Sequence, residues 1–137
     1  MYKVYAVPVT DPIVQEYVVK FTMKTKFAEL GHISWVYSKL VAMNALTYIV
    51  TDDIGRVKMV SCFVLDGKDE AQNVLTYSDS KSVEETKTMT DLVKKELKKL
   101  GVREIFTIIW GDYKRGEAAE KLFGGKVKGT YLVINLD

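Results

Sequence analysis

Apolar positions recur along the chain at spacings that change from strand-like to helical and back. Alternation over Tyr2–Val9 predicts a first strand. Asp11-Pro12 then predicts the start of a helix, because aspartate accepts hydrogen bonds from free N–H groups and proline suits the first helical position. Gly31 is expected to end this helix, and Ser34 to cap a second helix that runs through Val41.

Three shorter apolar runs in the middle of the chain predict an antiparallel meander. Leu46–Thr51 and Val57–Leu65 are separated by Asp52–Gly55, and a glycine at this place is typical of a hairpin turn. Asp66-Gly67 marks a second turn. The third strand of the meander is then expected over Ala71–Tyr77.

A capping box opens the next predicted helix, with Ser82 at its N-terminus and Glu85 three residues later. Gly101 is expected to close this helix in the left-handed conformation that glycine adopts easily. One face is largely apolar and the other carries lysines and glutamates, so the helix is expected to lie on a core. The inward face comprises Met89, Leu92, Val93, Glu96, Leu97 and Leu100.

The C-terminal part begins with Glu104–Trp110, a run rich in isoleucine and aromatic residues that predicts a strand buried on both faces. Asp112 is expected to cap a short alanine-rich helix that ends near Phe123. Lys126–Leu136 predicts the last strand. The complete order is β-α-α-β-β-β-α-β-α-β, which is an α/β (α+β) arrangement.

Length and composition narrow the class of protein. The chain has 137 residues, which predicts a single domain over residues 1–137. Its net charge of +2 is too small to indicate a nucleic acid or an anionic membrane as partner. The single cysteine, Cys62, excludes an intrachain disulfide, and no apolar run approaches the length of a membrane span. With no signal-peptide pattern at the N-terminus, we expect an intracellular protein.

The element order and the C-terminal pattern IIWGDYKRGEAAEKLFGGKVKG together resemble the GNAT superfamily of N-acetyltransferases. The pattern is most similar to small phage-type members of that superfamily, some of which are virion components. The resemblance covers nearly the whole chain and implies a mixed central sheet of about six strands. It also implies acetyl-CoA as cofactor, lying between the fourth and fifth strands, with its pyrophosphate at the N-terminus of the third helix. Free N–H groups and the helix dipole hold an anion at such a place.

The resemblance implies a cofactor site in the segment from the fourth strand to the third helix. Main-chain groups of Val74–Tyr77 would pair with the pantetheine arm, and N–H groups of Ser80–Val83 would hold the pyrophosphate. The implied cofactor-binding residues are Val74, Leu75, Thr76, Tyr77, Ser78, Ser80, Lys81, Ser82 and Val83.

Two features of this segment depart from the family pattern. The loop lacks the glycines that let a main chain approach phosphates, and Asp79, Glu84 and Glu85 bring carboxylates that repel a diphosphate. The family often places a tyrosine as general acid about one turn before the last glycine, where this chain has Glu120 and Lys121. These departures predict weak or absent catalysis.

The catalytic residues stay unassigned at this stage. A base near the amine nucleophile would be needed, and the turns offer several carboxylates, although turns contain aspartates for backbone reasons as well. The carboxylates considered are Asp52, Asp53, Asp66, Asp69 and Glu70. His32, the sole histidine, is interpreted as a linker or cap residue, and no metal-ligand set is evident.

Two interpretations of function remain open from the sequence. One is an acetyl-CoA-dependent N-acetyltransferase with a divergent cofactor loop, located in the cytoplasm. The other is a non-catalytic domain that binds a protein partner, for example in a phage virion; Trp35, Tyr37 and Tyr113 are then the expected contacts, because tyrosine and tryptophan dominate interfaces. The 12 residues after Gly125 favour the second interpretation, since they are barely enough for the family's closing pair of strands. Oligomeric state is left open.

Overall fold

The computed structural model describes residues 1–23, 33–67, 69–80, 82–108, 126–128 and 131–136. Contacts divide the chain into two units. The first unit comprises Met1–Val64 and Val74–Asp79, and the second comprises Leu65–Asn73 and Ser80–Asp137. Strands β3 and β4 each run through both units, so the single domain over residues 1–137 stays a prediction.

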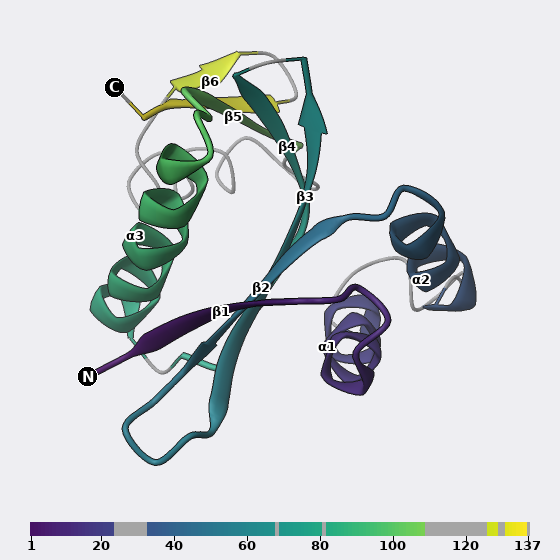
Figure 1. Ribbon diagram of the computed structural model, residues 1–137. Coiled ribbons are helices and arrows are strands. Elements are labelled where there is room, and N and C mark those ends of the chain that lie inside the picture. Colours follow the sequence, from purple (N-terminus) through teal and green to yellow (C-terminus); the bar gives the residue numbers. More distant parts are fainter. Residues whose placement is uncertain (24–32, 68, 81, 109–125, 129–130, 137) are drawn as a thin grey trace. The chain divides into compact units, whose positions relative to one another are not determined.

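Three helices and seven strands are described (Figure 1). The strands form a mixed sheet of order β1-β2-β3-β4-β5-β7-β6, in which β4 and β5 are parallel and β5 and β7 antiparallel. The mixed α+β architecture is therefore confirmed. The elements are β1 (Lys3–Val7), α1 (Pro12–Met23), α2 (Ile33–Ala42), β2 (Leu46–Thr51), β3 (Val57–Asp66), β4 (Glu70–Ser78), α3 (Val83–Lys99), β5 (Glu104–Ile108), β6 (Lys126–Lys128) and β7 (Tyr131–Asn135).

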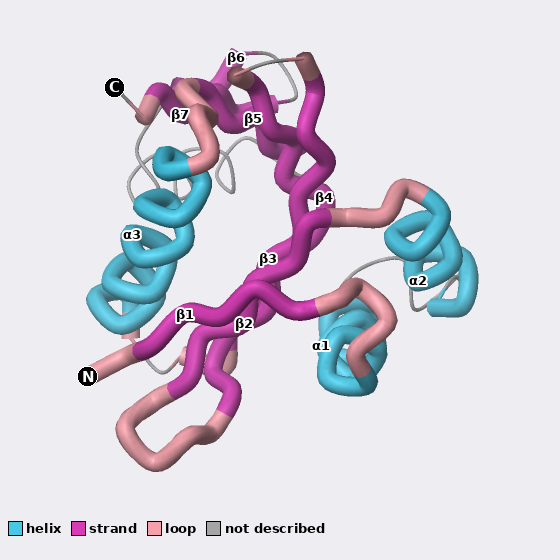
Figure 2. Tube along the Cα trace, viewed as in Figure 1, coloured by secondary structure: helices cyan, strands magenta, loops and turns pink. Residues whose placement is uncertain are grey.

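In the first unit, α1 and α2 bury apolar side chains on one face of the strands. Figure 2 shows the two helices close to each other beside β2 and β3. The face is set by the strand alternation, since Val60 and Cys62 join the core cluster while Ser61 between them does not. The cluster consists of Val9, Val14, Tyr17, Val18, Leu40, Ala45, Val60, Cys62 and Leu75.

Both predicted helices of this unit are present, with one correction. Asp11 caps α1 as expected, because its Oδ1 accepts a hydrogen bond of 3.0 Å from the Ile13 N–H. The prediction that Ser34 caps α2 is wrong, because α2 already begins at Ile33 and Ser34 lies inside its first turn. Gly31, the expected end of the first helix, lies outside the described residues.

The hairpin of β2 and β3 confirms the predicted turn. The strands pair antiparallel from Leu46 opposite Phe63, and Gly55 in the turn has φ of 82°. The carboxylate of Asp52 organises this turn by accepting hydrogen bonds from the N–H groups of Ile54 (3.1 Å) and Arg56 (2.9 Å). Such bonds from an aspartate to the next residues are typical of turns.

In the second unit, α3 begins and ends where its sequence predicts. Ser82 is the N-cap, and its hydroxyl accepts from the Glu85 N–H at 3.1 Å. At the other end Gly101 has φ of 90°, and its N–H donates to the Lys98 carbonyl. The buried side chains of the predicted inward face are Met89, Val93 and Leu97, whereas Leu100 is exposed.

The C-terminal prediction of one strand over Lys126–Leu136 is wrong, because the structure has two. Strands β6 and β7 pair antiparallel, with Lys128 opposite Tyr131, and β7 continues along β5. The final residues therefore suffice for a closing pair of strands, and the length argument for a non-catalytic domain fails. The predicted short helix after Asp112 lies outside the described residues.

Strand β5 is less buried than predicted over its described residues, Glu104–Ile108. Ile105 is buried while Phe106 and Thr107 are half-buried, and Ile109 and Trp110 lie outside the described residues. Within the described ranges, no helix combines the length and the apolar character that crossing a lipid bilayer requires.

Candidate cofactor segment and its aspartate

Strand β4 carries the first five residues of the predicted cofactor segment, Val74–Ser78. Its preceding half, Glu70–Asn73, pairs in parallel with Glu104–Thr107 of β5. The side chain of Leu75 is buried in the core cluster, and those of Val74 and Tyr77 pack against this cluster. These side chains hold β4 in place, so a ligand would have to use the main chain of the strand.

Thr76 makes a short polar contact inside the same unit. Its Oγ1 lies 2.6 Å from the Oγ of Ser61 on β3, and Ser61 is buried. One hydroxyl donates and the other accepts, which satisfies both polar groups away from water. The Thr76 side chain thus fixes β4 against β3.

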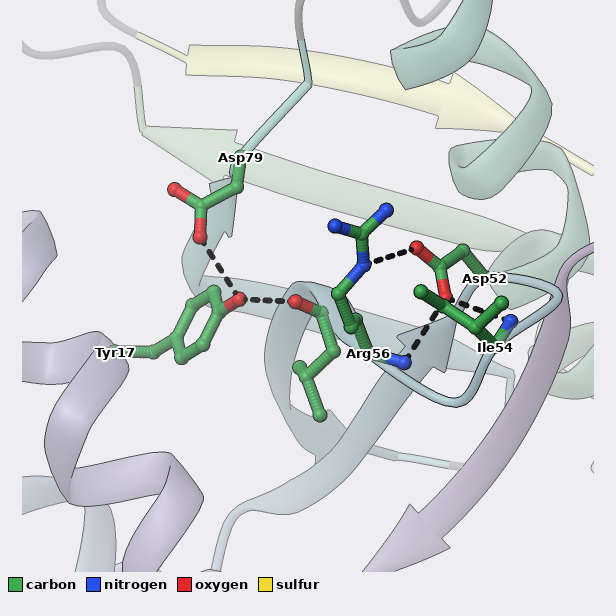
Figure 3. A network of polar contacts seen from close by, with 6 residues as sticks. Tyr17, Asp52, Ile54, Arg56 and Asp79 are labelled. Atoms are coloured by element: carbon green, nitrogen blue, oxygen red, sulfur yellow. Dashed lines mark hydrogen bonds and ion pairs between the residues drawn. The ribbon is translucent and has the colours of Figure 1, made fainter.

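Asp79, the residue after β4, makes the main polar contacts of this region (Figure 3). Its Oδ2 lies 3.0 Å from the hydroxyl of Tyr17 and 3.0 Å from the Nζ of Lys20, both on α1. The Tyr17 hydroxyl also lies 2.7 Å from the carbonyl oxygen of Val57. The Lys20 ammonium stands 4.6 Å from the centre of the Tyr17 ring, where a cation–π attraction adds to the ion pair.

These contacts shift the pKa values of both partners. Burial by itself would raise the pKa of Asp79, but hydrogen bonds from Lys20, Tyr17 and Tyr77 outweigh it and lower that pKa. Burial, followed by the hydrogen bond to Asp79, raises the pKa of Tyr17. At neutral pH the carboxylate is therefore charged and the phenol neutral. The negative charge that the sequence places in the loop has a cation beside it.

The first turn of α3 carries the rest of the predicted cofactor segment. Ser82 caps the helix, and its N–H donates to the Oγ of Ser80 at 3.2 Å. Ser80 is half-buried, whereas Ser82 and Val83 are exposed. Lys81 lies outside the described residues.

Two opposing features meet at this helix start. N–H groups in the first turn of any helix have no acceptor within the helix, and the Ser82 hydroxyl satisfies only the N–H of Glu85. The N–H groups of Val83 and Glu84 precede it in the same turn. Glu84, however, is exposed and brings a carboxylate to the same turn. The turn can thus donate hydrogen bonds to an anion, but against a local negative charge.

The carboxylates considered as bases have structural roles or lie in the open. Burial would raise the pKa of Asp52, but hydrogen bonds from Arg56 and Ile54 lower it. Asp53 forms an ion pair with the amino terminus. The carbonyl oxygen of Asp69 accepts from the N–H of Arg103 at 2.8 Å. Asp66 is exposed at the end of β3, and Glu70 begins β4 opposite Glu104. None of the five is surrounded by groups that mark it as a base.

The aromatic residues expected to contact a partner are only partly described. Tyr37 is half-buried and packs against the core cluster of the first unit, and its role as a partner contact stays a prediction. The Trp35 side chain and Tyr113 lie outside the described residues, as do His32, Glu120 and Lys121.

Cys62 and the search for metal ligands add no reactive centre. Burial raises the pKa of the Cys62 thiol to about 11, which keeps it protonated at neutral pH. Among the residues that the structure describes, no group of three or more histidine, cysteine, aspartate or glutamate side chains is placed to hold a metal ion.

Sequence reasoning missed Tyr17 and Lys20. Their spacing of three residues places both on one side of α1, which the helical pattern does indicate. Their common partner, however, is Asp79, which lies 62 residues after Tyr17 and 59 after Lys20. No local signal in the sequence joins positions so far apart.

Comparison with known proteins gives structural matches only. No protein-family model matches the sequence, and no curated protein matches it. An aminoglycoside 6'-acetyltransferase type Ii matches with a TM-score of 0.67 and 15% identity, over 98% of this chain and 97% of that chain. An acetyltransferase of the GNAT family from Staphylococcus aureus matches with a TM-score of 0.60 and 8% identity, over the whole of both chains.

A third match was solved with a cofactor. The N-acetyltransferase PseH of Campylobacter jejuni, in complex with acetyl coenzyme A, has a TM-score of 0.63 and 12% identity, over 98% of this chain and 100% of that chain. Matches at this level of identity show the fold, and here they cover the chain from end to end. With its mixed sheet, parallel β4–β5 pair and N-capped α3, the chain has the fold of the GNAT superfamily of N-acetyltransferases.

Proposed function

We propose that this chain binds acetyl-CoA through the segment Val74–Val83 and that its acetyl transfer is weak. One observation carries the proposal: the fold matches, over nearly the whole of both chains, an N-acetyltransferase in complex with acetyl coenzyme A. A fold alone does not determine an activity, so the residues of the segment decide how strong the activity is.

Two sets of main-chain groups in the segment support the proposal. Main-chain groups of Val74–Tyr77 would pair with the pantetheine amides, as an added strand pairs with a sheet. We assign the pyrophosphate to the N–H groups of Ser80–Val83 at the positive end of α3, where the Ser82 N–H would exchange its bond to the Ser80 Oγ for one to a phosphate. Asp79 fits this assignment because its carboxylate is paired with Lys20 at 3.0 Å. Bound acetyl-CoA supplies the activated acetyl group.

Three features support weak transfer. The loop has no glycine, so side chains limit how closely its main chain approaches a phosphate. Glu84 places a carboxylate in the first turn of α3. The acidic candidates for a base are engaged in turns, ion pairs or open strand ends, as for Asp52 and its three contacts with Ile54 and Arg56.

The alternative is a non-catalytic domain of the same fold that binds a protein partner, as in a phage virion, instead of acting in the cytoplasm. The glycine-free, acidic loop favours it. The two functions differ in a direct way, because only the first requires coenzyme A to bind.

Isothermal titration calorimetry of the full chain with acetyl-CoA distinguishes them. We expect one molecule bound per chain with micromolar affinity, followed by slow thiol release when an amine acceptor is added. Absence of heat at millimolar ligand would overturn the proposal and leave the protein-binding domain.

A charge variant makes the same titration sharper. Glu84→Gln removes the carboxylate in the first turn of α3 and is expected to tighten acetyl-CoA binding by about two- to fivefold, the usual effect of one charge at a helix terminus. Asp91→Asn, at an exposed position farther along the same helix, is the matched control and should leave the affinity unchanged. Equal effects of both variants would contradict binding at the helix start.

A further inference from the structure

The residue after β4 is fixed at three points within the first unit. The Asp79 N–H donates to the carbonyl oxygen of Lys58 on β3 at 2.8 Å. Its carboxylate accepts hydrogen bonds from the Tyr17 hydroxyl and the Lys20 ammonium of α1, each at 3.0 Å. The carboxylate is thus held by a helix and the backbone by a strand, although neither neighbours Asp79 in sequence.

Lys20 is itself fixed from more than one side. Its ammonium stands 4.6 Å from the centre of the Tyr17 ring and 3.0 Å from Asp79, while Glu16 one turn earlier lies 4.0 Å away. Tyr77 of β4 meets the Tyr17 ring edge-on, with ring centres 5.7 Å apart. The Tyr17 ring therefore restricts the positions open to the ammonium, and Asp79 lies within hydrogen-bond distance of it.

This arrangement changes what Asp79 does in the connection between β4 and α3. Considered alone, an aspartate here repels a diphosphate. Considered with Lys20, it is half of an ion pair whose two side chains are about one-third exposed, at 38% and 35%. The ion pair also holds the first residue of the connection in one position, in a loop without a glycine.

We propose that Asp79 is a positioning residue for the coenzyme A diphosphate, held by Tyr17 and neutralised by Lys20. The inference rests on the proposed function, because it concerns the same segment. The proposed effect of Asp79 on diphosphate binding is the opposite of that expected from its charge alone. The negative charge supports binding as long as Lys20 is present, and opposes binding only when Lys20 is removed.

Four variants of the full chain test this reversal by calorimetry with acetyl-CoA. Lys20→Met leaves the Asp79 carboxylate without its cation and is expected to weaken binding by about two- to fivefold, the scale of a partly exposed ion pair. Asp79→Asn keeps the shape but loses the charge and should weaken binding less. The double variant should bind more tightly than Lys20→Met alone, because it removes the unpaired charge. Lys20→Arg keeps a cation beside Asp79 and should bind acetyl-CoA with the affinity of the unchanged chain.

The order of affinities separates this proposal from its rivals. Simple repulsion by Asp79 predicts that Asp79→Asn binds most tightly, and that result would overturn the proposal. A purely structural role predicts that the double variant binds most weakly, which would overturn it as well. Lys95→Met, at an exposed lysine of α3, is the matched control and should leave the affinity unchanged.

A measurement without ligand tests the ion pair separately from the proposed function. Urea unfolding of the same four chains should show an energetic coupling between positions 20 and 79. If the unchanged chain binds no acetyl-CoA but the coupling is present, the proposed function and the positioning role both fail while the ion pair stands. If the chain binds acetyl-CoA and no coupling is found in either measurement, the positioning role alone is overturned.

Discussion

Two aspartates of the first unit, Asp52 in the β2–β3 turn and Asp79 after β4, show how differently one residue type is used. Both accept hydrogen bonds from a basic side chain, and both have a lowered pKa. The partners of Asp52 lie two and four residues further along the chain. Those of Asp79 lie 59 and 62 residues earlier, on α1.

The difference shows that the effect of a loop carboxylate on its surroundings depends on which groups pair with it. Asp52 would make its contacts in any hairpin of this sequence, because they close within five residues. Asp79 acquires its contacts only when α1 packs on the strands, and this packing changes it from a repelling charge into a paired one. The two sites should therefore respond differently when the packing or the turn is altered.

The largest effect on the free energy of unfolding is expected at Tyr17, which belongs to the core and also contacts Asp79. Tyr17 is 2% exposed, so Tyr17→Ala should lower the free energy of unfolding by about 3–4 kcal/mol through the cavity it leaves. Tyr17→Phe keeps the ring and removes the hydroxyl, and should cost about 1 kcal/mol. Urea unfolding measures both, with Tyr5→Phe at an exposed position as control. No loss in Tyr17→Phe would mean that the hydroxyl contacts with Val57 and Asp79 do not stabilise the fold.

The next effect concerns the turn around Asp52. Gly55 has φ of 82°, and no atom lies within 4 Å of the point that an added Cβ would occupy, so Gly55→Ala costs backbone strain alone, about 1 kcal/mol. Gly55→Asn should cost less, because asparagine tolerates the left-handed conformation better. Thermal unfolding measures the pair. Equal stability of alanine and asparagine at this position would show that backbone conformation does not limit the turn.

The loss of stability at acid pH allows the two aspartates to be compared directly. Both pKa values lie below the unfolded value of about 3.9, so each contribution is present above that pH and is lost as the pH falls through the folded pKa. Urea midpoints from pH 6 down to pH 2 should therefore fall less steeply in Asp79→Asn and in Asp52→Asn than in the unchanged chain. Tyr17→Ala should also reduce the contribution of Asp79 to this pH dependence, while leaving the contribution of Asp52 unchanged. An unchanged slope in Tyr17→Ala would show that the Asp79 pKa does not depend on Tyr17.

The smallest effect is expected from Arg56→Met. The Arg56 side chain is 70% exposed, and the exposed ion pair with Asp52 adds little once the backbone contacts are made. Its N–H still donates to Asp52 in the variant, so the hairpin turn should persist. Amide hydrogen exchange at residue 56 measures this, and strong loss of protection would show that the guanidinium holds the turn.

The local features of the fold were predictable because their causes lie within a few residues. Asp11 at the start of α1, Ser82 at the start of α3 and Gly101 at its end each act on their own helix. The errors arose where packing or pairing decides. The expected last strand consists of two strands, β6 and β7, that pair antiparallel, and Tyr37 is half-buried against the core cluster.

The place of the candidate site stays a prediction from the sequence, and the contacts of Asp79 within it were not predictable. The sequence by itself determined the order of the elements from β1 to β5, the capped start of α3 and the absence of glycine before it, since these depend on residue type and short spacing. Only the tertiary structure decided that Lys20 and Tyr17 meet Asp79. The physical reason is that an ion pair between distant positions exists only after the apolar face of α1 has packed and brought the two side chains within hydrogen-bonding distance.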